Sequence, residues 1–406
     1  MAQRKHRFWS GVTLTATLLA ILGVAVAIHR LEIPASRVTD PVLQTSAPTV
    51  TLRGASVLLT DSYQPRGRTA SLEELRADQI NLSRVANRIE VGVHINNNFQ
   101  LDFDIPAYSS NGTLWLKWTP ALQQQLAARN LQVQDLLVLA NLMDDQTRGA
   151  LRPAMPEPQK LADGRLLQQF TFTGKFKIDR LDLHRFPFNS LALPLILEAD
   201  DPGGVFNFNN LRLLPDTEDS GLGQFKDISG WINEGWSLAE FRHRVRSDFG
   251  EGSDSRSVDH SQVVFESVYR TSTWASFWKL LQPMSVVLAM TVLIPKIDRR
   301  QWDLRAGAPI TILLTLVFLQ QGYKADLPPL PYLTFLDRLY VFAYLTALTS
   351  FIFGLWSCRR ETVLRELPEG PERHREDARL DRLDQLFPTL LIFSGVAVVA
   401  LAWMMP

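Results

Sequence analysis

Apolar residues along this chain are concentrated near its start and in its last third, with a mostly polar stretch between them. The last third contains four long apolar segments, each about the length that a helix needs to cross the hydrocarbon core of a membrane. The first of them contains Pro283, which membrane helices tolerate where neighbouring helices satisfy the freed carbonyl. The pattern therefore predicts a membrane protein with spanning helices at about residues 274–294, 306–322, 339–356 and 387–405.

The polar middle of the chain has a period of two. From Ile89 to Ile95, apolar residues alternate with polar residues or glycine, as in a half-buried strand. Turn signals such as Asn111-Gly112 and Asp163-Gly164 separate several similar segments. Many short strands at this spacing predict an antiparallel β-sandwich, with a helical turn expected within 123–142. Further strands are expected at 113–118, 166–177, 191–198, 205–211, 236–245 and 262–269.

The chain begins with a basic segment and an apolar run that ends near Ala25-Val26-Ala27. This is the pattern of a secretory signal peptide, although the run is long enough for an uncleaved signal anchor. Next come a linker rich in Pro, Ser and Thr and a capping box at Ser71-Leu72-Glu73-Glu74 that opens a short helix. We expect a signal peptide or anchor at 1–28, a linker at 29–70, the β-sandwich at 71–270 and the helical domain at 271–406.

The charges of the connecting segments predict the orientation. Arginine-rich segments join the first helix to the second and, over 357–386, the third to the fourth. Such segments remain in the cytoplasm, whereas the connection between the second and third helices has one lysine and is expected outside. The β-domain and the C-terminus are then both external.

The second apolar segment, from Ala306 to Gly322, is interrupted by small and polar residues. On a helical wheel one stripe collects residues at successive spacings of four and three, and the opposite side is mostly apolar. Asp303 falls on this stripe one turn earlier, whereas Arg305 points to the other side. A mixed face suits a water-filled path, but Gly, Thr and Gln also serve helix packing in membranes, so this segment leaves both interpretations open. The stripe consists of Gly307, Thr311, Leu314, Phe318, Gln321 and Ala325.

Composition excludes several function classes. Lys and Arg together balance Asp and Glu at 42 each, so no global charge bias points to nucleic acid. Cys358 is the only cysteine, which rules out an intrachain disulfide and a cysteine-based zinc site. The histidines show no metal spacing, and there is no nucleophile elbow or phosphate-binding glycine loop. We therefore expect neither an enzyme nor a cofactor or metal site.

The segment Leu181–Leu195, LDLHRFPFNSLALPL, resembles the signature loop of the pentameric ligand-gated ion channels, the Cys-loop receptor superfamily, with Phe186-Pro187-Phe188 at its aromatic-Pro-Phe core. The resemblance is to bacterial members, which lack the two cysteines that name the family. Two positions depart from the family pattern, because Asn189 and Pro120 each stand where the family usually has Asp. Other similar features, spread over about residues 70–406, are Trp118, Arg270 before the first helix, Pro283, Leu327–Asp337 and Phe387–Leu390.

The resemblance implies a homopentamer in a bacterial inner membrane, with the N-terminal domain periplasmic or extracellular and the second helix around a pore. The stripe would line that pore, Leu314 and Phe318 would close it by dewetting, and five copies of Asp303 would favour cations. A small molecule or protons would act on the β-domain. The expected gating interface comprises Phe186, Pro187, Phe188, Asn189, Arg270, Pro329, Pro331 and Tyr332. Aromatic candidates for an agonist site are Phe206, Phe208, Trp231, Trp236, Phe241 and Phe249, although core packing is the alternative for each.

A second interpretation stays open. The chain could be a non-conducting receptor, whose β-domain senses a ligand and whose helices anchor it and signal through a partner. Ion flux through liposomes separates the two interpretations.

Overall fold

A computed structural model describes residues 85–143, 150–178, 181–201, 204–245, 258–325, 327–366 and 368–404. The predicted signal segment, linker and capping box, and Phe249, lie outside these residues. The described chain divides into two compact units. One is made of strands, and the other contains the long helices together with a short loop, Asp182–Asn189, from the middle of the sequence.

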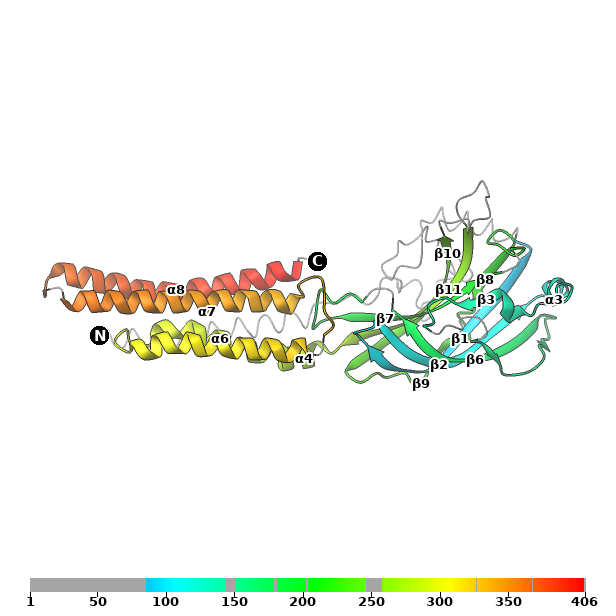
Figure 1. Cartoon of the computed structure of the whole chain (residues 1–406), viewed down its shortest axis with the longest axis horizontal. Helices are drawn as coiled ribbons and strands as arrows, with labels where there is room; N and C mark the ends of the chain where they lie inside the picture. The colour runs from blue at the N-terminus through cyan, green and yellow to red at the C-terminus, as the bar shows by residue number, and fades with distance from the viewer. Residues whose placement is uncertain are drawn as a thin grey trace. The chain divides into compact units, whose positions relative to one another are not determined.

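The strand unit is a β-sandwich of a seven-stranded and a four-stranded sheet (Figure 1). Apolar side chains from both sheets form one core, to which the alternating positions of β1, from Ile89 to Ile95, contribute as predicted. The larger sheet contains β1 (Asn87–Asp102), β2 (Ala107–Trp118), β4 (Arg152–Pro153), β5 (Gln159–Lys160), β6 (Leu166–Lys177), β8 (Leu211–Pro215) and β9 (Gly221–Phe225). The smaller contains β3 (Leu137–Leu139), β7 (Ser190–Ala199), β10 (Trp231–Val245) and β11 (Val258–Thr271).

Pairing within the larger sheet is mixed, which corrects the expectation of a wholly antiparallel fold. β1 pairs antiparallel with β2, but β8 and β9 both run parallel to β1. β8 and β9 have five residues each, whereas β1 has 16. The two short strands therefore cover successive parts of the edge of β1 that does not pair with β2. Covering the edge satisfies backbone groups that would otherwise be free to pair with another chain.

The strand predicted at 205–211 is instead a turn, and β8 begins at its last residue. The Asp201 carboxylate accepts hydrogen bonds from the backbone N–H groups of Val205 and Phe206. The Asn210 side chain likewise accepts from Asn207 N–H. These side chains compete with a strand ladder for backbone donors and hold the segment in a turn.

Asn111-Gly112 is not a turn but lies inside β2. Gly112 pairs with Ile95 on one side and Phe172 on the other. A Cβ atom at this position would lie 2.4 Å from the His94 carbonyl oxygen, so the glycine permits close approach of neighbouring strands. The predicted turn at Asp163-Gly164 is present, with Gly164 at φ 83°.

Two helical segments follow β2. Pro120, which departs from the family pattern, is the first residue of α3 (Pro120–Ala127). Thr119 caps that helix through a hydrogen bond from Leu122 N–H, and proline at the first position is favourable because its missing N–H would have no partner there. A 3₁₀ helix, η1 (Val133–Leu136), precedes β3.

Among the residues that the structure describes, four helices of the helical unit are long and apolar enough to cross a membrane, which fits a multi-pass membrane protein. α5 and α7 each contact both α6 and α8. The first spanning helix changes to a π-helical turn just before Pro283, which has no N–H to continue the α-helical pattern. The elements are α4 (Thr273–Ser276), η2 (Phe277–Leu281), α5 (Gln282–Leu293), η3 (Ile294–Lys296), α6 (Trp302–Lys324), α7 (Phe335–Glu366) and α8 (Pro371–Met404).

The last two helices are longer than predicted, so most of the expected loop at 357–386 is helical. α7 continues to Glu366 and α8 begins at Pro371. The charged residues of this segment are good helix formers, and hydropathy alone does not detect them. Leu364 and Leu380 are buried, which shows that the extensions retain a packed side.

Candidate functional site

The stripe predicted on the second membrane helix is the face of α6 that the rest of its own unit leaves uncovered. Leu314 and Phe318 are 56% and 67% exposed. On the opposite side Ile312 and Leu316 are buried in the helical core. The other stripe members, Thr311, Gln321 and Ala325, are also exposed, Gly307 is half-buried, and Asp303 continues the exposed face by one turn.

The uncovered face of α6 carries polar groups in the membrane-spanning part. Thr311 donates its hydroxyl proton to the Gly307 carbonyl oxygen at 3.2 Å, and Thr315 donates to the Thr311 carbonyl at 2.9 Å. Because these protons are used within the helix, each hydroxyl oxygen presents acceptor lone pairs outward. Acceptors of this kind solvate cations better than anions.

The corresponding face of α8 is different. Between Leu390 and Met404 its exposed large side chains are apolar, and Ser394 is its one exposed polar residue, compared with Thr311, Thr315 and Gln321 on α6. A face of this composition suits contact with lipid. The exposed large residues of this helix in its apolar part are Leu390, Phe393, Val396, Leu401 and Met404.

Arg305 is fully buried on the side of α6 away from the stripe. Its Nη2 atom lies 2.5 Å from Asp384 Oδ1 of α8 and 3.3 Å from the Pro295 carbonyl oxygen. The guanidinium also lies 5.9 Å from the centre of the Phe353 ring. The wheel therefore placed both charges correctly: Asp303 is exposed on the stripe, and Arg305 is directed into the helical unit.

Arg299, in the connection before α6, is surrounded by carboxylates. Three of them lie on one face of α8, at Asp377, Asp381 and Asp384, and Glu361 of α7 lies 3.6 Å away. The Arg299 side chain is only 9% exposed. This acidic cluster fixes the connection to the extended parts of α7 and α8, and no sequence pattern predicted it.

The Asp182–Asn189 loop is hydrogen-bonded to the start of α7. The His184 carbonyl accepts from Phe335 N–H at 2.7 Å, and the Phe186 carbonyl accepts from Leu336 N–H at 3.2 Å. The first N–H groups of a helix have no partner within the helix, so the loop supplies the acceptors that α7 lacks. Tyr332 strengthens the junction, because its ring stacks on His184 with centroids 3.7 Å apart and its hydroxyl accepts from Leu183 N–H.

Aromatic side chains of the loop continue into the helical core. Phe186 stacks against Tyr323, in the last turn of α6, with ring centroids 6.1 Å apart. Phe188 is buried between Phe335 of α7 and Trp403 of α8, with centroids at 6.1 Å from each. The loop thus contacts three of the four long helices.

Asn189 closes the loop. Its side-chain amide donates to the Asp182 carbonyl at 3.2 Å, and its backbone N–H donates to Thr271 Oγ1 at 3.1 Å. The Thr271 hydroxyl in turn donates to the Pro187 carbonyl at 2.8 Å. A carboxylate could not donate to Asp182, which gives a physical reason for asparagine where the family usually has aspartate.

Of the remaining predicted gating residues, three prolines belong to the helical unit and Arg270 belongs to the strand unit. Pro187 is buried in the loop, whereas Pro329 and Pro331 are exposed. Arg270, at the end of β11, pairs with Glu234 at 2.7 Å within the strand unit. The residues that sequence reasoning missed are His184, Tyr323, Phe335, Asp337 and Trp403; of these, Asp337 had a usable signal, since Thr334 and Asp337 have capping-box spacing.

The aromatic agonist candidates are dispersed in the strand unit. Phe206 and Phe241 are buried, and Trp236 stacks on the core residue Phe265 at 5.1 Å. The Arg212 guanidinium, itself paired with Glu240, lies 4.3 Å from the centre of the Phe208 ring. Trp231 packs against the core and lies 6.1 Å from Phe103. Core packing or an internal cation therefore accounts for each of these five rings.

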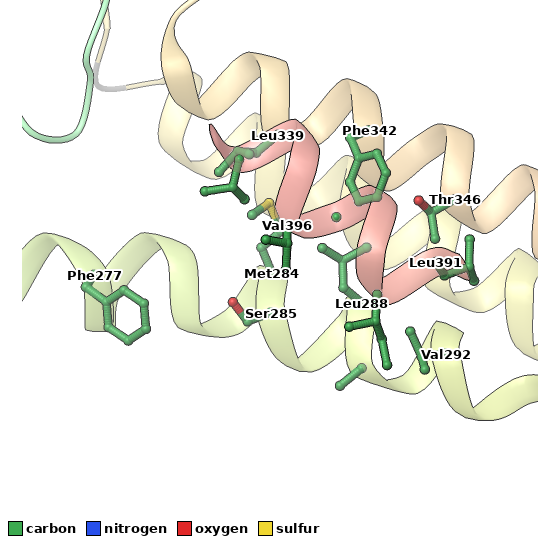
Figure 2. Close-up of a pocket in the computed structure, with 14 residues that line it drawn as sticks. Phe277, Met284, Ser285, Leu288, Val292, Leu339, Phe342, Thr346, Leu391 and Val396 are labelled. Carbon is green, nitrogen blue, oxygen red and sulfur yellow. The ribbon is translucent and has the colours of Figure 1, made fainter. Parts of the chain in front are cut away.

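A partly open pocket of about 130 Å³ lies among the helices of the helical unit (Figure 2). Its walls are almost wholly apolar, with hydroxyl groups from Ser285 and Thr346, and Ser285 donates to the Leu281 carbonyl. The lining residues belong to η2, α5, α7 and α8, so the pocket is separate from the uncovered face of α6.

No protein-family model matches the chain, and comparison with curated proteins finds no significant match. The architecture is a β-sandwich followed by four apolar helices, which is compatible with that of the pentameric ligand-gated ion channels.

Proposed function

We propose that this chain forms a homopentameric, cation-selective channel opened by a small ligand or protons acting on the β-domain. The observation that carries the proposal is the uncovered face of α6. It combines outward hydroxyl oxygens with the exposed apolar residues Leu314 and Phe318. This face has more exposed polar residues than the exposed face of α8, and a pore can use both features, the hydroxyl oxygens for hydrated ions and the apolar residues for closing by dewetting.

Selectivity in this proposal follows from the arrangement of charge at the Trp302 end of α6. Asp303 is exposed on the pore face, and Arg305 is held away from it by Asp384. Five copies of Asp303 would form an anionic ring at the cytoplasmic mouth, while the five Arg305 charges would be compensated inside each subunit. The β-domain would lie in the periplasm or outside the cell.

The test is ion flux through liposomes that contain the purified protein. Leu314→Ser removes one of the two apolar groups of the proposed gate and should produce a monovalent cation leak at neutral pH. Leu345→Ser on α7 is the matched control, since Leu345 is 58% exposed in the chain but lies on another helix. A silent Leu314→Ser protein, at neutral and at acidic pH, would favour the non-conducting receptor.

Asp303→Asn tests selectivity. In the leaking Leu314→Ser background, it should move the reversal potential toward the chloride equilibrium potential, because the anionic ring is lost. A reversal potential that already follows chloride before the substitution would reject cation selectivity while leaving conduction established.

A further inference from the structure

Asp337 uses its two carboxylate oxygens for two different helices. Oδ2 accepts from Thr334 N–H at 3.1 Å and from the Thr334 hydroxyl at 2.9 Å, while Thr334 Oγ1 accepts from Asp337 N–H at 3.1 Å. This is the reciprocal arrangement of a capping box, and it holds the first turn of α7. The Asp337 side chain is only 10% exposed.

The other oxygen, Oδ1, is directed to the last turn of α6. The Tyr323 hydroxyl donates to it, and Lys324 Nζ lies 3.4 Å away. Lys324 is half-exposed, so its contribution is screened by solvent. Tyr323 is buried, and a buried hydrogen bond to a charged group is among the stronger ones that a protein makes.

Tyr323 also joins α6 to the Asp182–Asn189 loop. Its ring lies between Phe186 of the loop, at 6.1 Å, and Tyr340 of α7, at 5.3 Å. Because the loop carbonyls cap the start of α7, the loop, the first turn of α7 and the last turn of α6 share one continuous set of contacts.

We propose that Asp337 is a positioning residue that ties the Lys324 end of α6 to the start of α7 and to the Asp182–Asn189 loop. The inference rests on the proposed channel function and deepens it. A displacement of the loop reaches the pore helix through the Phe186–Tyr323 ring contact and, by way of the first turn of α7, through the Asp337–Tyr323 hydrogen bond, and not only along the connecting segment 325–334. Opening of the channel would then require Asp337 and Tyr323 to move together, or their hydrogen bond to break.

The first experiment measures the contact without requiring conduction. Gly322 is exposed at the Lys324 end of α6, and a Cβ atom there meets nothing within 4 Å, so Gly322→Cys accepts a spin label. Cys358→Ser removes the only native cysteine. In this labelled protein, Tyr323→Phe and Asp337→Asn should each increase the mobility of the label, and the double variant should fall short of the sum of the singles, because the Tyr323–Asp337 contact that both weaken can be lost only once.

Tyr340→Phe is the matched control, since it removes a hydroxyl from the same aromatic cluster but not from Asp337. It should leave the label unchanged. Unchanged mobility in Tyr323→Phe, or a double variant equal to the sum of the singles, would overturn the proposal. The Tyr323→Phe variant keeps both the ring packing and the Asp337–Thr334 cap, so it should still fold.

The second experiment measures ion flux in the Leu314→Ser background. Loss of the bond in one gating state changes the opening equilibrium by about 10-fold to 150-fold, in the same direction for Tyr323→Phe and Asp337→Asn. Effects no larger than that of Tyr340→Phe would overturn the gating role. Absence of flux in Leu314→Ser itself would reject the channel, and the spin-label result would still decide whether Asp337 positions α6.

Discussion

Replacing Asp384 by alanine removes the carboxylate that two arginines share. Asp384 Oδ1 lies 2.5 Å from Arg305 Nη2, and Oδ2 lies 2.8 Å from Arg299 Nε. The side chains of Arg305 and Arg299 are 0% and 9% exposed, so water cannot replace the lost partner. Two charge-assisted hydrogen bonds at about 1.5–3 kcal/mol each give about 3–6 kcal/mol, and leaving a buried charge unpaired costs about 3–5 kcal/mol. Because Arg299 keeps Asp377, Asp381 and Glu361 as partners, we expect a loss in the lower part of this range.

Asp377 offers an internal comparison, because its carboxylate contacts the same Arg299. This contact is 3.1 Å long, but the Asp377 side chain is 57% exposed. An exposed ion pair of this kind contributes under about 1 kcal/mol. We therefore expect Asp384→Ala to lower the free energy of unfolding about 3 kcal/mol more than Asp377→Ala.

The assay is denaturant unfolding of the purified protein in detergent micelles, followed by circular dichroism. A combined Asp384→Leu, Arg305→Met variant should recover much of the loss, since an apolar pair of similar size can replace a buried ion pair. Equal losses in Asp384→Ala and Asp377→Ala would refute the reasoning, as would no recovery in the combined variant.

Three further predictions concern the strand unit and the loop. A hydrogen bond that His243 Nδ1–H donates to the Glu198 carboxylate raises the pKa of His243 above its ordinary value, against the opposing effect of burial. This pair should stabilise the fold fully below about pH 6.5 and lose its effect as pH rises through the raised pKa, so His243→Gln should lower the melting temperature more at about pH 5.5 than at about pH 9. Glu198→Gln should abolish that difference. Asn189→Asp replaces a buried donor to the Asp182 carbonyl by an acceptor and should lower the free energy of unfolding by about 1–3 kcal/mol near neutral pH. In acid the protonated carboxyl can donate again, so part of the stability should return. A melting temperature independent of pH would contradict this. Gly112→Ala should cost about 1–3 kcal/mol in thermal unfolding, and an unchanged melting temperature would show that the strands can separate at little cost.

The sequence was informative where burial follows a simple period. The alternation at Ile89–Ile95 predicted β1, and the spacing of Thr311, Leu314 and Phe318 predicted which face of α6 remains uncovered. Each of these features belongs to a single strand or helix and depends only on which of its side chains avoid water or lipid. Arg305 was placed by the same wheel, although its partner Asp384 was not identified.

Features that depend on distant residues were missed. The parallel pairing of β8 and β9 with β1 depends on which edge is free, and the turn at 205–211 depends on side-chain acceptors that hydropathy ignores. The acidic cluster around Arg299 required α7 and α8 to be long enough to bring their charges beside it. The capping of α7 by the Asp182–Asn189 loop joins backbone groups about 150 residues apart, as in Phe335 N–H to His184 O.

The two ends of α6 are held by ion pairs of different burial, and this asymmetry predicts which end moves. Near Trp302, fully buried Arg305 is bound to Asp384, and a Cβ atom on Gly354 of α7 would lie 3.0 Å from the Arg305 carbonyl oxygen. The Lys324 end is held by the Asp337 carboxylate, by the Tyr323 ring and by a hydrogen bond from the Tyr344 hydroxyl to Gln320, and its ion pair is the half-exposed contact between Lys324 and Asp337.

In the proposed channel, opening by Leu314→Ser should therefore change distances between subunits more at the Lys324 end than near Trp302. Spin labels at Gly322→Cys and at Ile310→Cys, both exposed positions, measure the two parts in separate Cys358→Ser proteins. A shift at residue 310 equal to or larger than that at 322 would mean that the Arg305–Asp384 pair does not restrain the helix. In that case the acidic cluster would serve the stability of the subunit alone, and the wheel position of Asp303 would not be fixed during gating.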